Sequence, residues 1–181
     1  MERINLISVS VFVALVTFAL AMMEIQIEGT GNWARNLPTW RPFGYFAPTG
    51  YHFAMWGLML AMFHMPFLVG SASWTLRSEA WVFALIATVA VFEDFWWYLL
   101  NPAWSSRIFM QTATPHWPIT YSICIALSIL FAWGAGKLPK QISVLGVMVA
   151  LTIILVLGSG FFWRKTDPVT TTKILNQSVN R

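Results

Sequence analysis

The chain has 181 residues, of which 57% are hydrophobic and only 10% are charged. Soluble domains average about 25% charged residues, so this composition excludes an ordinary soluble protein and predicts a chain that crosses a membrane several times. The net charge of +4 is spread over many segments. A nucleic-acid surface needs basic residues gathered on one face, and without such a cluster nucleic acid is excluded as a partner.

Five long apolar runs predict five transmembrane helices, because about 20 residues cross a hydrocarbon core of about 30 Å. The predicted fold class is therefore an all-α integral membrane bundle, with the lipid bilayer as its surroundings. It forms one domain over residues 1–163, followed by a polar tail over residues 164–181. The predicted spans are residues 4–23, 51–69, 80–100, 119–133 and 143–163.

The basic residues predict the orientation, since cytoplasmic loops carry the excess of Lys and Arg. With five spans, seven of the 11 basic residues fall on the side of the C-terminal tail. We therefore expect a protein of the cell (inner) membrane with its C-terminus in the cytoplasm. Arg3, beside the first span, favours the opposite orientation.

The first span ends in Ala19-x-Ala21, a pattern that also occurs at signal-peptide cleavage sites. Its apolar run is longer than that of a signal peptide, so we interpret it as a transmembrane helix. The loop that follows is rich in Pro, Gly and aromatic residues, which predicts a segment lying in the membrane interface. At its start, Glu24 and Glu28 share one face if the helix continues. They are either solvated interfacial acids, or ligands or bases turned toward the bundle.

The second span carries His52, Met55, Met59 and Met62 at steps of three and four residues, which places them on one helix face. Imidazole and thioether together suit Cu(I), whereas imidazole with carboxylates suits zinc, iron or manganese. The alternative is that the methionines only pack against neighbouring helices. His64 lies much deeper along the same helix, so we expect it to be structural and separate from His52.

The third span holds two adjacent acids, Glu93 and Asp94, roughly 10 Å from its end at helical rise. An ionised carboxylate at such depth costs at least about 2.5 kcal/mol, so the pair needs a proton, a cation or a basic partner. One interpretation is a functional site. The alternative is a structural lock in which Arg41 or Arg107 holds the acids. Pro102 predicts that the helix ends near Asn101.

The loop after the third span places His116 between two prolines, a rigid setting that suits a ligand or an acid–base group but is also ordinary for the interface. The last two spans contain no acidic or basic residue and are interpreted as scaffold. If the spans run up and down, the ends that carry chemistry meet at one membrane face. The residues predicted to converge there are Glu24, Glu28, His52, Glu93, Asp94, His116 and Tyr121.

Several of these residues lie in distinctive strings: EIQIEG from Glu24, NLPTWR ending at Arg41, and EDFWWYLLNP from Glu93. The strings resemble those of a family of small prokaryotic polytopic membrane proteins that carry EIxxEG, LPTWR and EDFxWxxLNP. The resemblance covers roughly Glu24 to Tyr121, and one departure is Asn32, where glycine is expected. The family has no known activity, so the resemblance implies membership of the site and no reaction.

Three functional hypotheses follow. The first is a metal-dependent enzyme acting on a lipid or other apolar substrate, with zinc, iron, manganese or copper as the expected cofactor. Its predicted ligands are Glu93, Asp94, His52 and His116, with Glu24 or Glu28 as the catalytic ligand or general base. The second is a proton- or cation-coupled transporter or conduit, which the apolar last two spans disfavour. The third is an accessory subunit that docks onto other membrane subunits.

Overall fold

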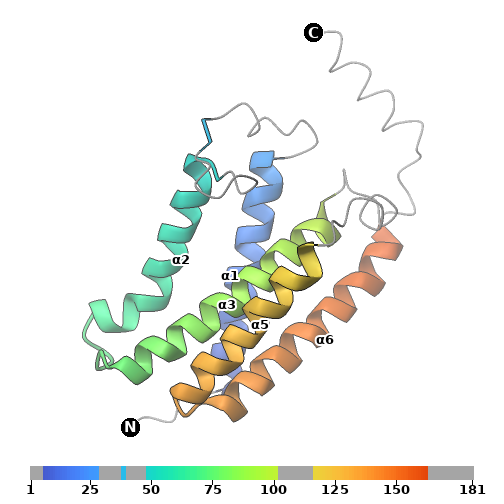
Figure 1. Cartoon of the computed structure of the whole chain (residues 1–181). Helices are drawn as coiled ribbons and strands as arrows, with labels where there is room; N and C mark the ends of the chain where they lie inside the picture. The colour runs from blue at the N-terminus through green and yellow to red at the C-terminus, as the bar shows by residue number, and fades with distance from the viewer. Residues whose placement is uncertain (1–5, 29–37, 40–47, 102–115, 163–181) are drawn as a thin grey trace, which may run out of the picture.

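The computed structural model describes residues 6–28, 38–39, 48–101 and 116–162, and within these ranges it is a bundle of five helices (Figure 1). No strand occurs in the described ranges, where the only β pairing is an isolated bridge between Thr39 and Thr49. The all-α prediction is therefore confirmed. The helices are α1 (Leu6–Glu28), α2 (Gly50–Leu68), α3 (Leu76–Leu100), α5 (His116–Gly134) and α6 (Leu138–Phe162).

Helix α3 is the centre of the bundle, because it contacts each of the other four helices and packs most extensively against α5 and α1. It runs antiparallel to α5, which in turn runs antiparallel to α6 (Figure 1). The sequence of α3 explains this central position, since the helix carries apolar and aromatic side chains on most of its sides. Its buried residues are Trp81, Val82, Ala84, Leu85, Thr88, Val89, Val91, Phe92, Trp96 and Trp97.

Local sequence signals set the helix ends. At the start of α3, the Thr75 hydroxyl accepts from the Ser78 amide at 3.1 Å, and Ser78 Oγ accepts from the Thr75 amide at 2.8 Å. This reciprocal pair is a capping box. Helix α5 ends at Gly134, and two residues later Gly136 has a φ of 69° that suits glycine, while the Lys137 amide donates to the Ala132 carbonyl at 2.7 Å. Helix α3 ends at Leu100, as Pro102 predicts.

Helices α1, α3, α5 and α6 extend beyond the predicted spans, and the extensions of α1 and α6 change the position of polar residues. Helix α1 continues from the predicted end at residue 23 to Glu28, so Glu24 and Glu28 belong to one helix. Helix α6 begins at Leu138, five residues before the predicted start at residue 143. The polar residue Gln141, which the predicted span left in a loop, is therefore part of a helix and fully buried.

Three of the described helices contain segments that are long and apolar enough to cross a membrane: Leu6–Ile27, Leu76–Leu100 and Leu138–Gly158. The apolar part of α5, Ile119–Gly134, is shorter, and α2 is not among the three. The described helices thus support a membrane protein. Helix α2, predicted as the span at residues 51–69, does not meet the criteria of length and apolarity, and the apolar part of α5, predicted as the span at residues 119–133, is shorter.

A buried polar cluster of Gln141, Thr88 and Ser128 joins α6, α3 and α5. Gln141 Nε2 donates to Thr88 Oγ1 at 2.6 Å and to Ser128 Oγ at 2.5 Å, and the two hydroxyls lie 3.1 Å apart. Thr88 Oγ1 also donates to the Ala84 carbonyl at 2.9 Å. Gln141 Oε1 is buried and has no hydrogen-bond partner among the described residues. The cluster fixes how the three helices are rotated relative to one another.

A second interhelical bond links α3 to α6, because Trp96 Nε1 donates to Thr152 Oγ1 at 2.7 Å. The Thr152 hydroxyl in turn donates to the Met148 carbonyl at 2.8 Å, which holds it in the right orientation. Trp96 is buried, so its N–H has little access to any other acceptor.

We expect a double-mutant cycle of Trp96→Phe and Thr152→Val to give a coupling energy of about 0.6 kcal/mol, and no more than about 1.7 kcal/mol, as for other interhelical bonds in membranes. The measurement is the free energy of unfolding in mixed micelles, obtained by reversible titration with SDS. A coupling energy indistinguishable from zero would show that this bond does not hold α3 against α6.

Candidate functional site

A cavity of about 300 Å³ lies between α1, α2, α3 and α5. Its polar residues come from one end of each helix and its apolar residues from the adjoining turns toward the bundle centre. A larger depression of about 410 Å³ on the outer face of α5 is lined by that helix alone and has no ionisable residue. The cavity between the four helices is lined by Glu24, His52, Glu93, Asp94, Thr120 and Tyr121, and by the less polar Leu20, Met55, Trp56, Met59, Val89, Ala90, Val91 and Cys124.

The helix directions explain why these residues meet. Helices α1 and α3 approach the cavity end of the bundle, whereas α2 and α5 start there (Figure 1). Residues late in α1 and α3 therefore lie level with residues early in α2 and α5. In this way the structure brings five of the seven residues predicted to converge to a single cavity: Glu24, His52, Glu93, Asp94 and Tyr121.

The polar side chains of the cavity form two groups, and in the first group Glu24 accepts a hydrogen bond. Tyr51 Oη donates to Glu24 Oε1 at 3.2 Å, and His52 Nε2 lies 3.9 Å from the same oxygen. The Glu24 side chain is 13% exposed and that of His52 is 26% exposed, so both are largely withdrawn from solvent.

The other ring nitrogen of His52 is held at the start of α2. The Thr49 amide donates to His52 Nδ1 at 3.1 Å, and the Thr49 hydroxyl lies 3.0 Å from the same nitrogen. Thr49 is the N-cap of α2 and is 4% exposed. The contact replaces the Glu or Gln of an ordinary capping box by a histidine three residues after the cap.

The second polar group comes from α3 and α5. Tyr121 Oη donates to Asp94 Oδ2 at 2.5 Å, a short hydrogen bond. The neighbouring Glu93 also lines the cavity, and its Oε1 is buried. Although the two acids are adjacent in sequence, both contribute to the same cavity wall.

Met55 and Met59 are buried and line the cavity below His52. Their position agrees with the prediction that His52, Met55 and Met59 share one face of the helix. It fits both interpretations, packing methionines and soft metal ligands. The side chains of Glu28 and His116, together with Arg41 and Arg107, lie outside the described residues. Within the described part of the chain, no group of three or more His, Cys, Asp or Glu residues could hold a metal ion.

The structure adds Thr49 and Tyr51 to the residues expected from the sequence. Thr49 lies three residues before His52, and Tyr51 lies directly before it. The spacing Thr-x-x-His indicated Thr49, since it matches a capping box with histidine three residues after the cap. No local pattern indicated that Tyr51 would reach Glu24, because that contact joins two helices.

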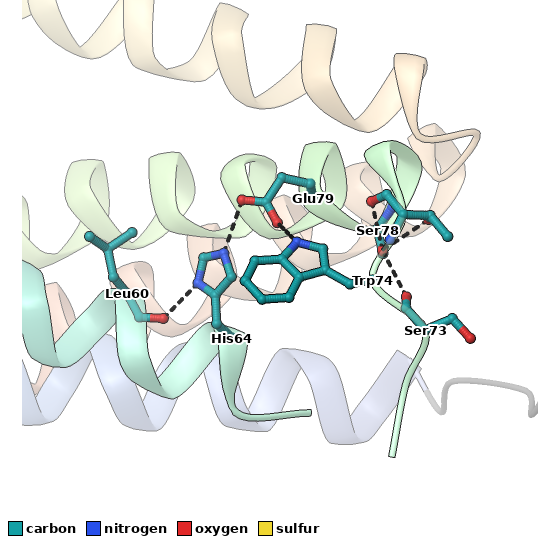
Figure 2. A network of polar contacts seen from close by, with 7 residues as sticks. Leu60, His64, Ser73, Trp74, Ser78 and Glu79 are labelled. Atoms are coloured by element: carbon teal, nitrogen blue, oxygen red, sulfur yellow. Dashed lines mark hydrogen bonds and ion pairs between the residues drawn. The ribbon is translucent and has the colours of Figure 1, made fainter. Parts of the chain in front are cut away.

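His64 belongs to a separate network at the other end of α2, where Figure 2 shows it between the Leu60 carbonyl and Glu79. Its Nδ1 lies 2.7 Å from the Leu60 oxygen and its Nε2 lies 3.0 Å from Glu79 Oε1, while Trp74 Nε1 donates to Glu79 Oε2 at 2.7 Å. Both ring nitrogens face acceptors, so both bonds form only when the ring carries a positive charge. This network pins α2 to α3, and His64 does not line the cavity.

The cavity therefore combines a carboxylate that accepts hydrogen bonds, an imidazole beside it and a second carboxylate–phenol pair, all above an apolar floor. Such groups can give and take protons on a molecule whose polar part reaches them. No protein-family model, curated protein or solved structure matches this chain.

Proposed function

We propose that the chain is an integral membrane protein with five spans, which include α2 and α5. Large apolar side chains are exposed on all five helices, a surface that water would not tolerate and lipid would solvate. On α2 and α5, for example, Leu58 is 49% exposed, Leu68 is 62% exposed and Ile123 is 53% exposed. The four-helix cavity then opens near one membrane face.

We propose that this cavity is the active site of a membrane-embedded enzyme that acts by acid–base chemistry on a lipid or other apolar substrate. The observation that carries the proposal is the order of the lining, with ionisable groups at the end of the bundle and apolar groups toward its centre. An amphiphile enters such a site with its head group at the carboxylates and its chain toward the bilayer centre. Glu24 is the proposed base, and Asp94 with Tyr121 orients the head group.

The size of the cavity limits what it encloses. A volume of about 300 Å³ equals roughly ten water-sized groups. This accommodates a head group and the first few carbons of a chain. The rest of a long chain would lie between the helices or in the lipid, which places the reaction near the head group.

The experiment that tests this function uses the purified protein in liposomes made from a total lipid extract, with mass spectrometry of the lipids before and after incubation. We expect a mass change in one lipid class with the wild type and none with Glu24→Gln. Glu79→Gln is the matched control, because it removes a carboxylate outside the cavity. A wild type that alters no lipid, with and without added metal ions, would contradict the enzyme and leave the conduit and the accessory subunit.

A divalent transition metal, as predicted from the sequence, is the second candidate feature of this site, because three carboxylates and one imidazole line the cavity, although the described residues form no group of three or more that could hold a metal ion. Glu93, Asp94, His52 and His116 are the proposed ligands, with zinc, iron, manganese and copper as candidates. If the site holds a metal, elemental analysis of the purified protein gives about one or two equivalents, and Glu93→Gln loses it while Glu79→Gln keeps it. Equal metal content in the two variants would contradict a site at Glu93.

A further inference from the structure

We propose that Met59 is a specificity-determining residue, which closes the apolar end of the four-helix cavity and so limits the length of the alkyl chain that the cavity encloses. The inference rests on the proposed function, because it concerns the chain of the same amphiphilic ligand. A chain longer than the cavity has to bend out between the helices, so the preferred ligands are amphiphiles with a short alkyl or acyl chain.

The first step concerns the depth of the cavity. Its lining on α2 begins at His52 and ends at Met59, seven residues later, which is about 10 Å at helical rise. On α3 the lining extends from Asp94 back to Val89. Met59 and Val89 are both buried and are the lining residues of α2 and α3 that lie farthest from the polar end. They therefore mark the apolar end of the cavity.

The second step concerns what lies beyond this end. One helical turn further toward the bundle centre, each of the four helices carries a buried residue that does not line the cavity. Phe63 packs edge to face against Phe12 of α1, with ring centroids 5.2 Å apart, and the Ser128 hydroxyl accepts from Gln141. Interiors packed in this way leave no space for a chain to continue. The four closing residues are Val16, Phe63, Leu85 and Ser128.

The third step concerns the choice of Met59 at the closed end. Its side chain is long, unbranched and flexible, so it occupies much of the space between the helices there. Val89 on the opposite wall is short and stiff at its branched carbon, and it cannot move into space that Met59 leaves. Truncating Met59 should therefore lengthen the cavity. In a cavity of about 300 Å³, roughly ten water-sized groups, the added length is a substantial change.

The test is native mass spectrometry of the purified protein in detergent, incubated with an equimolar mixture of n-alkanols from butanol to hexadecanol. The hydroxyl group suits the polar end, and detergent tails solvate the alkyl chain about as well as the apolar wall does. Occupancy should therefore depend little on chain length until the chain no longer fits. We expect it to fall about tenfold beyond a limiting length in the wild type, the effect of overpacking a closed site.

The variants are compared in the same mixture, so partition into the micelle is common to all of them. Met59→Ala should move the limit to chains about two or three carbons longer, because the truncated side chain leaves its space empty. Val89→Leu adds a methylene from the opposite wall and should shorten the limit by about one carbon. Met62→Ala is the matched control, since Met62 lies on the same helix and does not line the cavity, and it should keep the wild-type limit.

The absence of a limit in the wild type, an unchanged limit in Met59→Ala, or an equal shift in Met62→Ala would overturn the inference. If Met59→Ala does not fold, Val89→Leu decides, and an unchanged limit in that variant overturns it as well. Lipid conversion by the wild type together with an unchanged limit in Met59→Ala would refute this inference alone. The expected shifts without any lipid conversion would refute the proposed function alone.

Discussion

Replacing Glu24 by Gln is expected to slow lipid turnover by about 10²–10⁴-fold, the usual effect of removing a general base. The amide has the same shape as the carboxylate and can still accept from Tyr51 Oη, which lies 3.2 Å from Glu24 Oε1. It cannot take a proton, so the loss would fall on the chemical step. The measurement is the initial rate of lipid conversion in liposomes at equal amounts of folded protein.

Glu28→Gln is the comparison for this prediction, because both acids lie on α1 and both are candidate bases. If the large loss occurs in Glu28→Gln and not in Glu24→Gln, the base has been assigned to the wrong residue. A loss of less than about threefold in Glu24→Gln would remove Glu24 from the chemistry altogether. Tyr51→Phe should give a smaller loss, since the carboxylate keeps its charge and loses one donor.

Gln141→Ala is expected to lower the free energy of unfolding by about 2–4 kcal/mol. The side chain is fully buried between α3, α5 and α6, so truncation leaves a cavity and breaks the bonds to Thr88 and Ser128. Membrane helices have no hydrophobic force with which to close such a gap, because lipid is as apolar as the core. Reversible unfolding by SDS in mixed micelles measures the effect.

Gln141→Met is the matched control and should stay within about 1.5 kcal/mol of the wild type, because it fills nearly the same volume. The Thr88 and Ser128 hydroxyls keep each other and the Ala84 carbonyl as partners, and the buried Oε1 of Gln141 disappears. Equal destabilisation by Ala and Met would show that the lost hydrogen bonds, and not the lost volume, dominate. No change in Gln141→Ala would contradict the burial of this residue.

Hydropathy and helix-stop signals predicted the elements because both depend on local composition. The long apolar runs indicated α1, α3 and α6, and Pro102 predicted the end of α3 near Leu100. Errors occurred where a polar residue continues a helix. Gln141 was left outside the last span since its amide is unfavourable in lipid, and only the neighbouring hydroxyls of Thr88 and Ser128 make its burial tolerable.

The position of the acids could also be predicted, because an up-and-down bundle places the end of α3 beside the start of α2. Their individual partners could not. Whether Asp94 meets Tyr121, or Glu24 meets Tyr51, depends on how each helix is rotated about its axis, and apolar sequence on every side leaves that rotation open. The sequence by itself therefore determined an all-α chain in which Glu24, His52, Glu93 and Asp94 lie near one end. The tertiary structure decided which of them share a cavity, because that depends on contacts between residues distant in sequence. The exact start of α2 decided which nitrogen of His52 faces the cavity, because the Thr49 amide contacts the other one.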